Sequence, residues 1–200
     1  MATENAIERY IAADANRFAM TLFLISEGAF FGFLIIAYVY FHGAVHEGPD
    51  AANSLHPLTS GIYTAFLLAS SFTMWRAEKS HSRRRVLEFT LWLSATIAFG
   101  TIFLFGQGRE FIGLYRENIT VSRNVFGTSF FTLTGFHGLH VLLGLLALSL
   151  LLAVSFFGGF KTSDASAVRT IALYWHFVDW IWVIIFSVVY LWAILAKVPR

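Results

Sequence analysis

Long apolar segments recur along this chain, and they constrain its fold more than any other feature of the sequence. Short polar linkers separate five of them, at residues 18–41, 57–75, 86–106, 125–158 and 171–196. Because a helix rises ~1.5 Å per residue and a bilayer core is ~30 Å thick, roughly 20 apolar residues are enough to cross it. We therefore predict an all-α integral membrane bundle of five transmembrane helices, forming a single transmembrane domain over residues 1–200.

The composition indicates that lipid surrounds much of this chain. Hydrophobic residues make up 57% of the 200 positions and charged residues only 13%, where soluble domains have about 25% charged residues. A soluble protein of this size could not bury so much apolar surface. The sequence contains no cysteine, which excludes disulfides and thiolate metal sites within it. Its net charge of +2 gives no support for a nucleic-acid partner.

The basic residues predict how the bundle is oriented in the membrane. With five spans the two termini lie on opposite sides, and the side of the N-terminus would hold most of the 14 Lys and Arg residues. These residues are Arg9, Arg17, Arg76, Lys79, Arg83, Arg84, Arg85, Lys161 and Arg169. Cytoplasmic loops carry an excess of Lys and Arg, so the pattern favours a cytoplasmic N-terminus and an external C-terminus.

Glu27 is an ionisable residue well inside the first apolar segment, where an unpaired charge is costly. We expect it to be protonated or paired with another helix, with a direct role in proton movement or in lipid headgroup binding as alternatives. Gly28 and Gly32 have the small-xxx-small spacing that permits close contact between helices. They are our first candidates for helix packing.

His137 and His140 are separated by three positions in the fourth segment, which places both imidazoles on one helix face. Two histidines could begin a metal site, but such a site needs three or four ligands. We therefore favour hydrogen bonds between helices. Gly135 and Gly138 would allow the close approach that such bonds require.

Three more ionisable residues are candidates for the polar interior. His176 and Asp179 have the same spacing near the start of the fifth segment, and the simplest expectation is a self-contained pair that stabilises packing. Glu110 shares a face with Gln107 at the external end of the third segment, which is typical of a solvated helix end or of a site. Glu27, the two histidines and Asp179 have comparable predicted depths, so they could face one another within the bundle.

Four segments of the sequence together resemble subunit III of the haem-copper oxidases. They are Arg17–Phe31, Gln107–Phe111, Val125–Val141 and Tyr174–Trp182, in the order in which the family has them. Glu27 falls on the carbodiimide-reactive Glu of that family, and Phe111 stands where the family usually has Tyr. The chain looks like the five-helix bacterial form, which lacks the first two helices of many members.

The resemblance implies an accessory subunit of a proton-pumping terminal oxidase in the bacterial inner membrane. The whole complex reduces oxygen to water with electrons from cytochrome c or quinol. No catalytic, cofactor-binding or metal-binding residue is expected in this chain, and haem and copper are expected in partner subunits. The polar interior would consist of Glu27, Glu110, His137, His140, His176 and Asp179.

The resemblance also implies the partners of this chain. Oxidase subunit I would be the principal one, followed by subunit II, a small subunit IV and other respiratory complexes in a supercomplex. The helices would form two packed groups, the first two and the last three, around a cleft filled with phospholipid. The chain would stabilise subunit I, support its proton uptake and slow its inactivation during turnover.

Three alternatives to this interpretation stay open at the level of the sequence. The chain could be the subunit-III-like protein that accompanies nitric oxide reductase. It could instead be a freestanding proton or metal transporter that uses Glu27 and the His137–His140 pair. A third alternative is an assembly and lipid scaffold without any role in proton movement.

Overall fold

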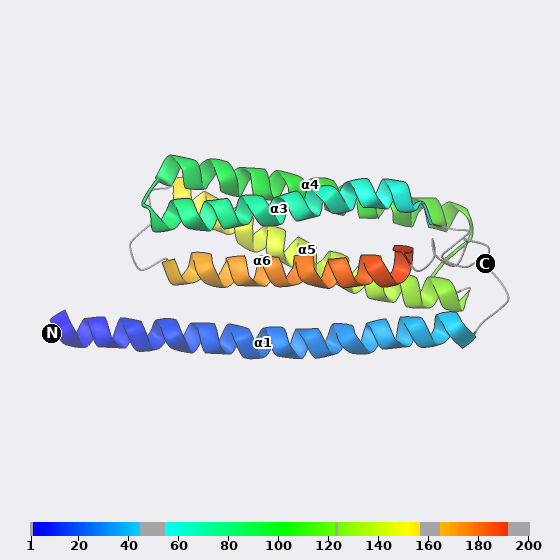
Figure 1. Cartoon of the computed structure of the whole chain (residues 1–200), viewed down its shortest axis with the longest axis horizontal. Helices are drawn as coiled ribbons and strands as arrows, with labels where there is room; N and C mark the ends of the chain where they lie inside the picture. Colours follow the sequence, from blue (N-terminus) through cyan, green and yellow to red (C-terminus); the bar gives the residue numbers. More distant parts are fainter. Residues whose placement is uncertain (1, 45–54, 123, 157–164, 192–200) are drawn as a thin grey trace.

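The computed structural model describes residues 2–44, 55–122, 124–156 and 165–191. Throughout this part of the chain, all regular structure is helical. The elements are α1 (Ala2–Ala44), α3 (Pro57–Ser82), α4 (Val86–Arg116), α5 (Val125–Phe156), α6 (Ala165–Phe186) and the π-helical turn η2 (Ser187–Leu191). The helices run side by side along a common direction (Figure 1). The prediction of an all-α bundle is confirmed.

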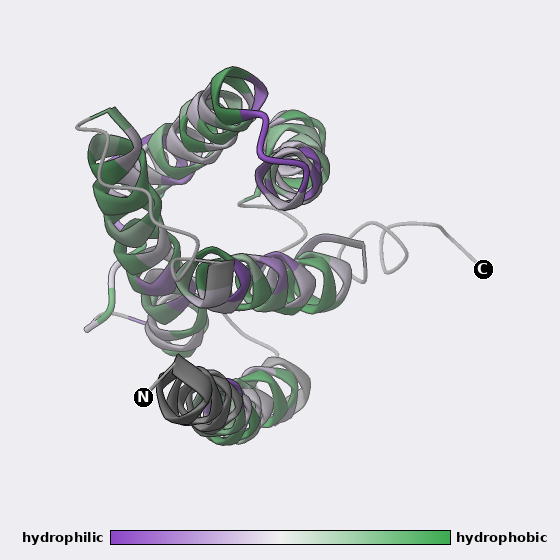
Figure 2. Ribbon diagram, turned by 90° about the vertical axis from the view of Figure 1, so that its left-hand side faces the viewer, coloured by the Kyte–Doolittle hydropathy of each residue, from purple (hydrophilic) through white to green (hydrophobic). Residues whose placement is uncertain are grey.

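Four helices of the described residues are long and apolar enough to cross a membrane. The qualifying stretches are residues 17–41, 86–116, 125–156 and 166–190. Hydrophobic residues are spread along all the helices, while the turn between α3 and α4 is hydrophilic (Figure 2). The chain is therefore a multi-pass membrane protein. The predicted second span corresponds to α3, which is not among the four helices.

The low hydropathy of α3 has a structural reason, because its buried face is polar. The buried residues of this helix are Ser60, Thr64, Leu67, Ser70, Thr73, Met74, Ala77 and Ser80. Two tryptophans of α6 bond to this face: Trp175 Nε1 donates to Ser70 Oγ at 3.1 Å and Trp182 Nε1 donates to Thr64 Oγ1 at 2.9 Å. α3 therefore packs against α6 partly through hydrogen bonds to its hydroxyl groups, and not through apolar side chains alone.

The helices extend beyond the apolar segments that predicted them. α3 continues past Trp75 to Ser82, and α4 continues past Gly106 to Arg116. Polar residues after Gly106 therefore continue α4 beyond the apolar part of the third predicted span. Hydropathy locates the lipid-facing part of a helix, whereas polar residues can continue the same helix beyond the bilayer. Residues 157–158 and 192–196 of the predicted spans lie outside the described residues.

A tight turn joins α3 to α4 and concentrates positive charge at one end of the bundle. Arg84 adopts a left-handed backbone with φ 58°. The amide of Arg84 donates to the His81 carbonyl at 2.9 Å, and the amide of Arg85 donates to the Ser80 carbonyl at 3.0 Å. This pair of bonds is a Schellman motif, which satisfies carbonyl groups at the end of α3. The turn brings α4 back antiparallel to α3.

The packing order differs from the expected two groups. α3 has its most extensive contacts with α4, while α5 contacts α1, α4 and α6, and α6 contacts α1, α3 and α5. α1 packs against α5 and α6. The prediction that the first two spans form one group is therefore wrong, because the short turn and the polar face of α3 place it with α4 and α6.

Two glycines, Gly100 and Gly144, leave room inside the bundle for the large side chain of Trp175. A Cβ atom at Gly100 would lie 2.7 Å from the Trp175 ring, and one at Gly144 would lie 2.8 Å from the same ring. The contact distances leave no room for a methyl group at either position. Trp175 is fully buried between these two glycines, so α4, α5 and α6 meet around its indole.

The four glycines predicted for helix packing differ in what they contact. A Cβ atom at Gly138 would lie 3.1 Å from Gln107 Oε1, and one at Gly28 would lie 3.8 Å from the Phe177 ring. Nothing lies within 4 Å of the corresponding position at Gly32 or Gly135. Gly138 thus lies in close contact with α4, whereas no described side chain packs against Gly32 or Gly135, and for these two glycines close packing stays a prediction.

Candidate functional site

Glu27 of α1 and His140 of α5 form a polar contact between these two helices. Glu27 Oε2 lies 3.1 Å from His140 Nε2, and the two side chains are 20% and 11% exposed. The other ring nitrogen, Nδ1, lies 2.7 Å from the carbonyl oxygen of Phe136, one turn earlier on α5. Both nitrogens of this imidazole are therefore engaged. Glu27 is paired with another helix, as one of the expectations for it required.

Tyr174 of α6 completes the surroundings of this pair. Its hydroxyl donates to the backbone carbonyl oxygen of His140 at 3.0 Å. The Phe31 ring of α1 stands edge-on to the His140 ring, with centroids 5.0 Å apart. The pair thus lies where α1, α5 and α6 meet, within the apolar part of the bundle.

His137 occupies an aromatic environment instead of a polar one. Its ring stacks on Trp182 with centroids 4.8 Å apart, and Phe103 and Phe31 stand edge-on at 6.0 and 6.3 Å. The side chain is completely buried, and neither ring nitrogen has a hydrogen-bond partner among the described residues. The expected inter-helix hydrogen bond is therefore found for His140 and not for His137, which packs as an aromatic ring.

Glu110 is tied to two other elements near the opposite end of the bundle from the arginine turn. Ser60 Oγ of α3 donates to Glu110 Oε1 at 2.8 Å, and Tyr190 Oη of η2 donates to Glu110 Oε2 at 2.6 Å. Each carboxylate oxygen thus receives one hydroxyl donor. Of the two expectations for Glu110, this arrangement favours a site over a solvated helix end.

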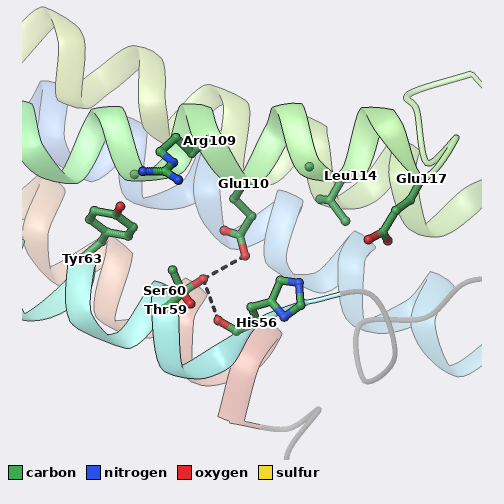
Figure 3. A pocket seen from close by; sticks show the side chains of 10 residues that line it. His56, Thr59, Ser60, Tyr63, Arg109, Glu110, Leu114 and Glu117 are labelled. Atoms are coloured by element: carbon green, nitrogen blue, oxygen red, sulfur yellow. Dashed lines mark hydrogen bonds between the residues drawn. The ribbon is translucent and has the colours of Figure 1, made fainter.

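A cavity of about 240 Å³ opens beside Glu110, between the start of α3 and the end of α4. Figure 3 shows the side chains around it, with Arg109 on α4, Glu117 just after the end of α4 and His56 just before α3. The lining therefore combines both signs of charge. Sequence reasoning missed Ser60 and this cavity, because nothing in the sequence pairs the start of α3 with the end of α4.

His176 and Asp179 have different environments, and no hydrogen bond joins them in the described structure. His176 Nδ1 lies 2.6 Å from Ser71 Oγ of α3. Asp179 is 3% exposed, and neither of its carboxyl oxygens has a hydrogen-bond partner among the described residues. The expected hydrogen-bonded pair of His176 and Asp179 is therefore wrong, because His176 bonds to the Ser71 hydroxyl of α3 instead.

The predicted polar residues do not converge on one point. Glu27 meets His140, Glu110 meets Ser60 and Tyr190, and Asp179 lies toward α3. Within the described ranges, no group of three or more His, Cys, Asp or Glu side chains could hold a metal ion. The polar contacts connect helices in pairs, so their chemistry is that of helix cross-links and proton-bearing groups.

Comparison with known proteins identifies the relatives of this chain. Residues 10–194 match the family model described as cytochrome c oxidase subunit III. Cytochrome c oxidase subunit 3 of Synechocystis sp. is 35% identical over 89% of this chain and 76% of its own length. The subunit 3 of Thermostichus vulcanus is 33% identical over 89% and 88% of the two chains. A probable cytochrome c oxidase subunit 3 of Mycobacterium leprae is 34% identical over 84% of each.

Proposed function

This chain belongs to the cytochrome c oxidase subunit III family and is a subunit III of a haem-copper oxidase, and we propose that it stabilises subunit I, binds phospholipid and supports proton uptake. The enzyme of which it is a subunit is an oxidoreductase. In this proposal the chain itself carries no redox centre, and the haem and copper of the complex reside in partner subunits.

One observation carries this proposal: the polar side chains of the interior are used to connect helices. Glu27 and His140 link α1 to α5, and Glu110 links α4 to Ser60 of α3 and Tyr190 of η2. A cofactor site would instead gather several ligands at one point. The distribution of these links favours an accessory, structural role for this subunit over a catalytic one.

The outward face of α1 supports a contact with lipid or with subunit I. Phe18, Phe33, Ile36 and Tyr40 are each more than half exposed along this helix. In a membrane protein such a surface is covered by acyl chains or by another subunit, because both keep apolar side chains away from water. Subunit I is the principal partner we propose, with subunit II, a small subunit IV and a respiratory supercomplex beyond it.

The ends of the bundle support an orientation in the bacterial inner membrane. The arginine turn Arg83–Arg85 and the beginning of α1 lie at the same end (Figure 1). We place this end in the cytoplasm, since positive residues are enriched on that side. The cavity beside Glu110 then faces the external side.

Cytochrome c is the electron donor that we propose for the complex. The relatives in Synechocystis and Thermostichus bear the name cytochrome c oxidase subunit 3, as does the matching family model. Because the subunit itself would touch neither donor nor haem, the donor is identified by the complex and not by any residue of this chain.

A tagged copy of the chain, purified from its native membrane in mild detergent, tests the proposal. We expect haem absorption bands and a large oxidase subunit in the eluate, identified by optical spectroscopy and mass spectrometry. A colourless eluate that contains this chain alone, even in the gentlest detergents, would contradict it. Proton or metal conduction by the pure chain in liposomes would favour a transporter.

A further inference from the structure

The bonding of His140 fixes which of its ring nitrogens carries hydrogen. Nδ1 lies 2.7 Å from the Phe136 carbonyl oxygen, and a carbonyl oxygen can only accept a hydrogen bond. Nδ1 must therefore carry the hydrogen and donate it. A neutral imidazole has one N–H, so Nε2 of a neutral His140 would present only a lone pair to Glu27.

The contact at Nε2 then requires a second proton. Glu27 Oε2 lies 3.1 Å from His140 Nε2, which is a hydrogen-bond distance. An ionised carboxylate is an acceptor only, and it would face a second acceptor across this distance. A proton between the two atoms removes the conflict, whether it resides on the carboxyl group or on the imidazole.

We propose that Glu27 and His140 bind one proton as a unit, and that this proton holds α1 onto α5. The unit has two forms, a carboxylic acid beside a neutral imidazole and a carboxylate beside an imidazolium. Moving the proton from Oε2 to Nε2 interconverts them, while the hydrogen on Nδ1 stays on the Phe136 carbonyl. Both forms have zero net charge, which suits a pair whose side chains are 20% and 11% exposed within an apolar bundle.

The groups around the pair leave the proton no other partner among the described residues. On α5, His137 is the nearest titratable group, and its ring is enclosed by aromatic rings without a hydrogen-bond partner. From α6, Tyr174 faces Glu27 and already donates its hydroxyl hydrogen to the His140 carbonyl oxygen. From α4, Gln107 carries no charge and donates to the Thr134 carbonyl oxygen.

Glu27→Gln provides a matched variant, because an amide N–H can donate to the lone pair of Nε2 without any titratable proton. This variant should keep the link between α1 and α5 without the shared proton. Glu88→Gln serves as the control, since Glu88 is an exposed carboxylate that pairs with Arg85 at 2.9 Å at the end of the bundle. His140→Gln assigns the imidazole signals.

The test is infrared difference spectroscopy of the purified complex in lipid at neutral pH, together with its thermal denaturation. The wild type minus Glu27→Gln should show a carboxylic acid C=O band, or paired carboxylate and imidazolium bands. Glu27→Gln should keep the denaturation midpoint of the wild type, because its amide still donates to Nε2. A carboxylate beside a neutral imidazole in the wild type, or a clearly lower midpoint for Glu27→Gln than for Glu88→Gln, overturns the proposal.

Discussion

Glu27 and His140 are 113 positions apart in the sequence, and their Oε2 and Nε2 atoms lie 3.1 Å apart in the bundle. This contact connects α1 to α5 across the apolar part of the molecule. Because it joins two helices that are far apart in the sequence, the contact bears on how the subunit is held together.

Glu27→Gln should leave the initial rate of oxygen reduction largely unchanged. The substitution removes no cofactor ligand and no contact with a reacting group, so we expect less than about a twofold change, or ~0.4 kcal/mol in activation free energy. Oxygen consumption by the purified complex measures this rate. Loss of haem incorporation, or complete loss of oxygen reduction, would contradict the accessory role.

His137→Ala should weaken retention of the subunit in the complex. The ring is fully buried against Trp182 and Phe103, so its removal leaves a cavity that costs on the order of 2–4 kcal/mol. His137→Phe should be retained much better, because neither ring nitrogen has a described hydrogen-bond partner that is lost. Subunit ratios after detergent washing give the comparison. A stoichiometric metal lost from His137→Ala would revive the metal-site alternative.

Tyr190→Phe should loosen the end of the bundle around Glu110. The variant removes a 2.6 Å hydrogen bond to the carboxylate, which is worth about 1.5–3 kcal/mol if the acceptor is charged. Tyr115→Phe is the control, since Tyr115 is 71% exposed on α4. Thermal denaturation should show a lower midpoint for Tyr190→Phe alone. Equal midpoints for the two variants would mean that the Glu110 link contributes nothing measurable.

Gly144→Ala should disturb the packing around the Trp175 side chain. The added methyl group would lie 2.8 Å from the indole, and overpacking of this kind typically costs about 1–3 kcal/mol. Gly135→Ala on the same helix has nothing within 4 Å and should be neutral, or stabilising by up to ~1 kcal/mol through helix propensity. The difference in denaturation midpoint between the two variants measures the effect. The reverse order would mean that Trp175 is not confined by α5.

The sequence predicted the helices well because lipid imposes a length and an apolar composition on each span. Hydropathy did not predict where the helices end, since polar residues such as Arg76 and Lys79 continue α3 beyond its apolar part. α3 is not apolar enough to qualify as a membrane span on hydropathy, although hydroxyl groups on its buried face bond to α6 and do not face water. Hydropathy measures the average character of a helix and not the side on which its polar groups lie.

The candidate site was only partly predictable for a related reason. Glu27 and His140 stood out as ionisable residues within apolar segments, but no local spacing could join α1 to α5. The i, i+3 pair His176 and Asp179 suggested a contact within one helix, and the Ser71 hydroxyl of α3 took its place. Contacts between helices depend on how the helices rotate about their axes, which packing around residues such as Trp175 determines.

Removing and restoring this subunit, while oxygen consumption by the complex is followed through time, tests the central claim most directly. The account predicts that the complex without the subunit keeps its haem spectrum and its initial rate, loses activity faster during turnover, and recovers its durability when the subunit is added back. Loss of haem or of the initial rate on removal of the subunit would contradict the account. Equal lifetimes with and without it would contradict the proposed support of subunit I.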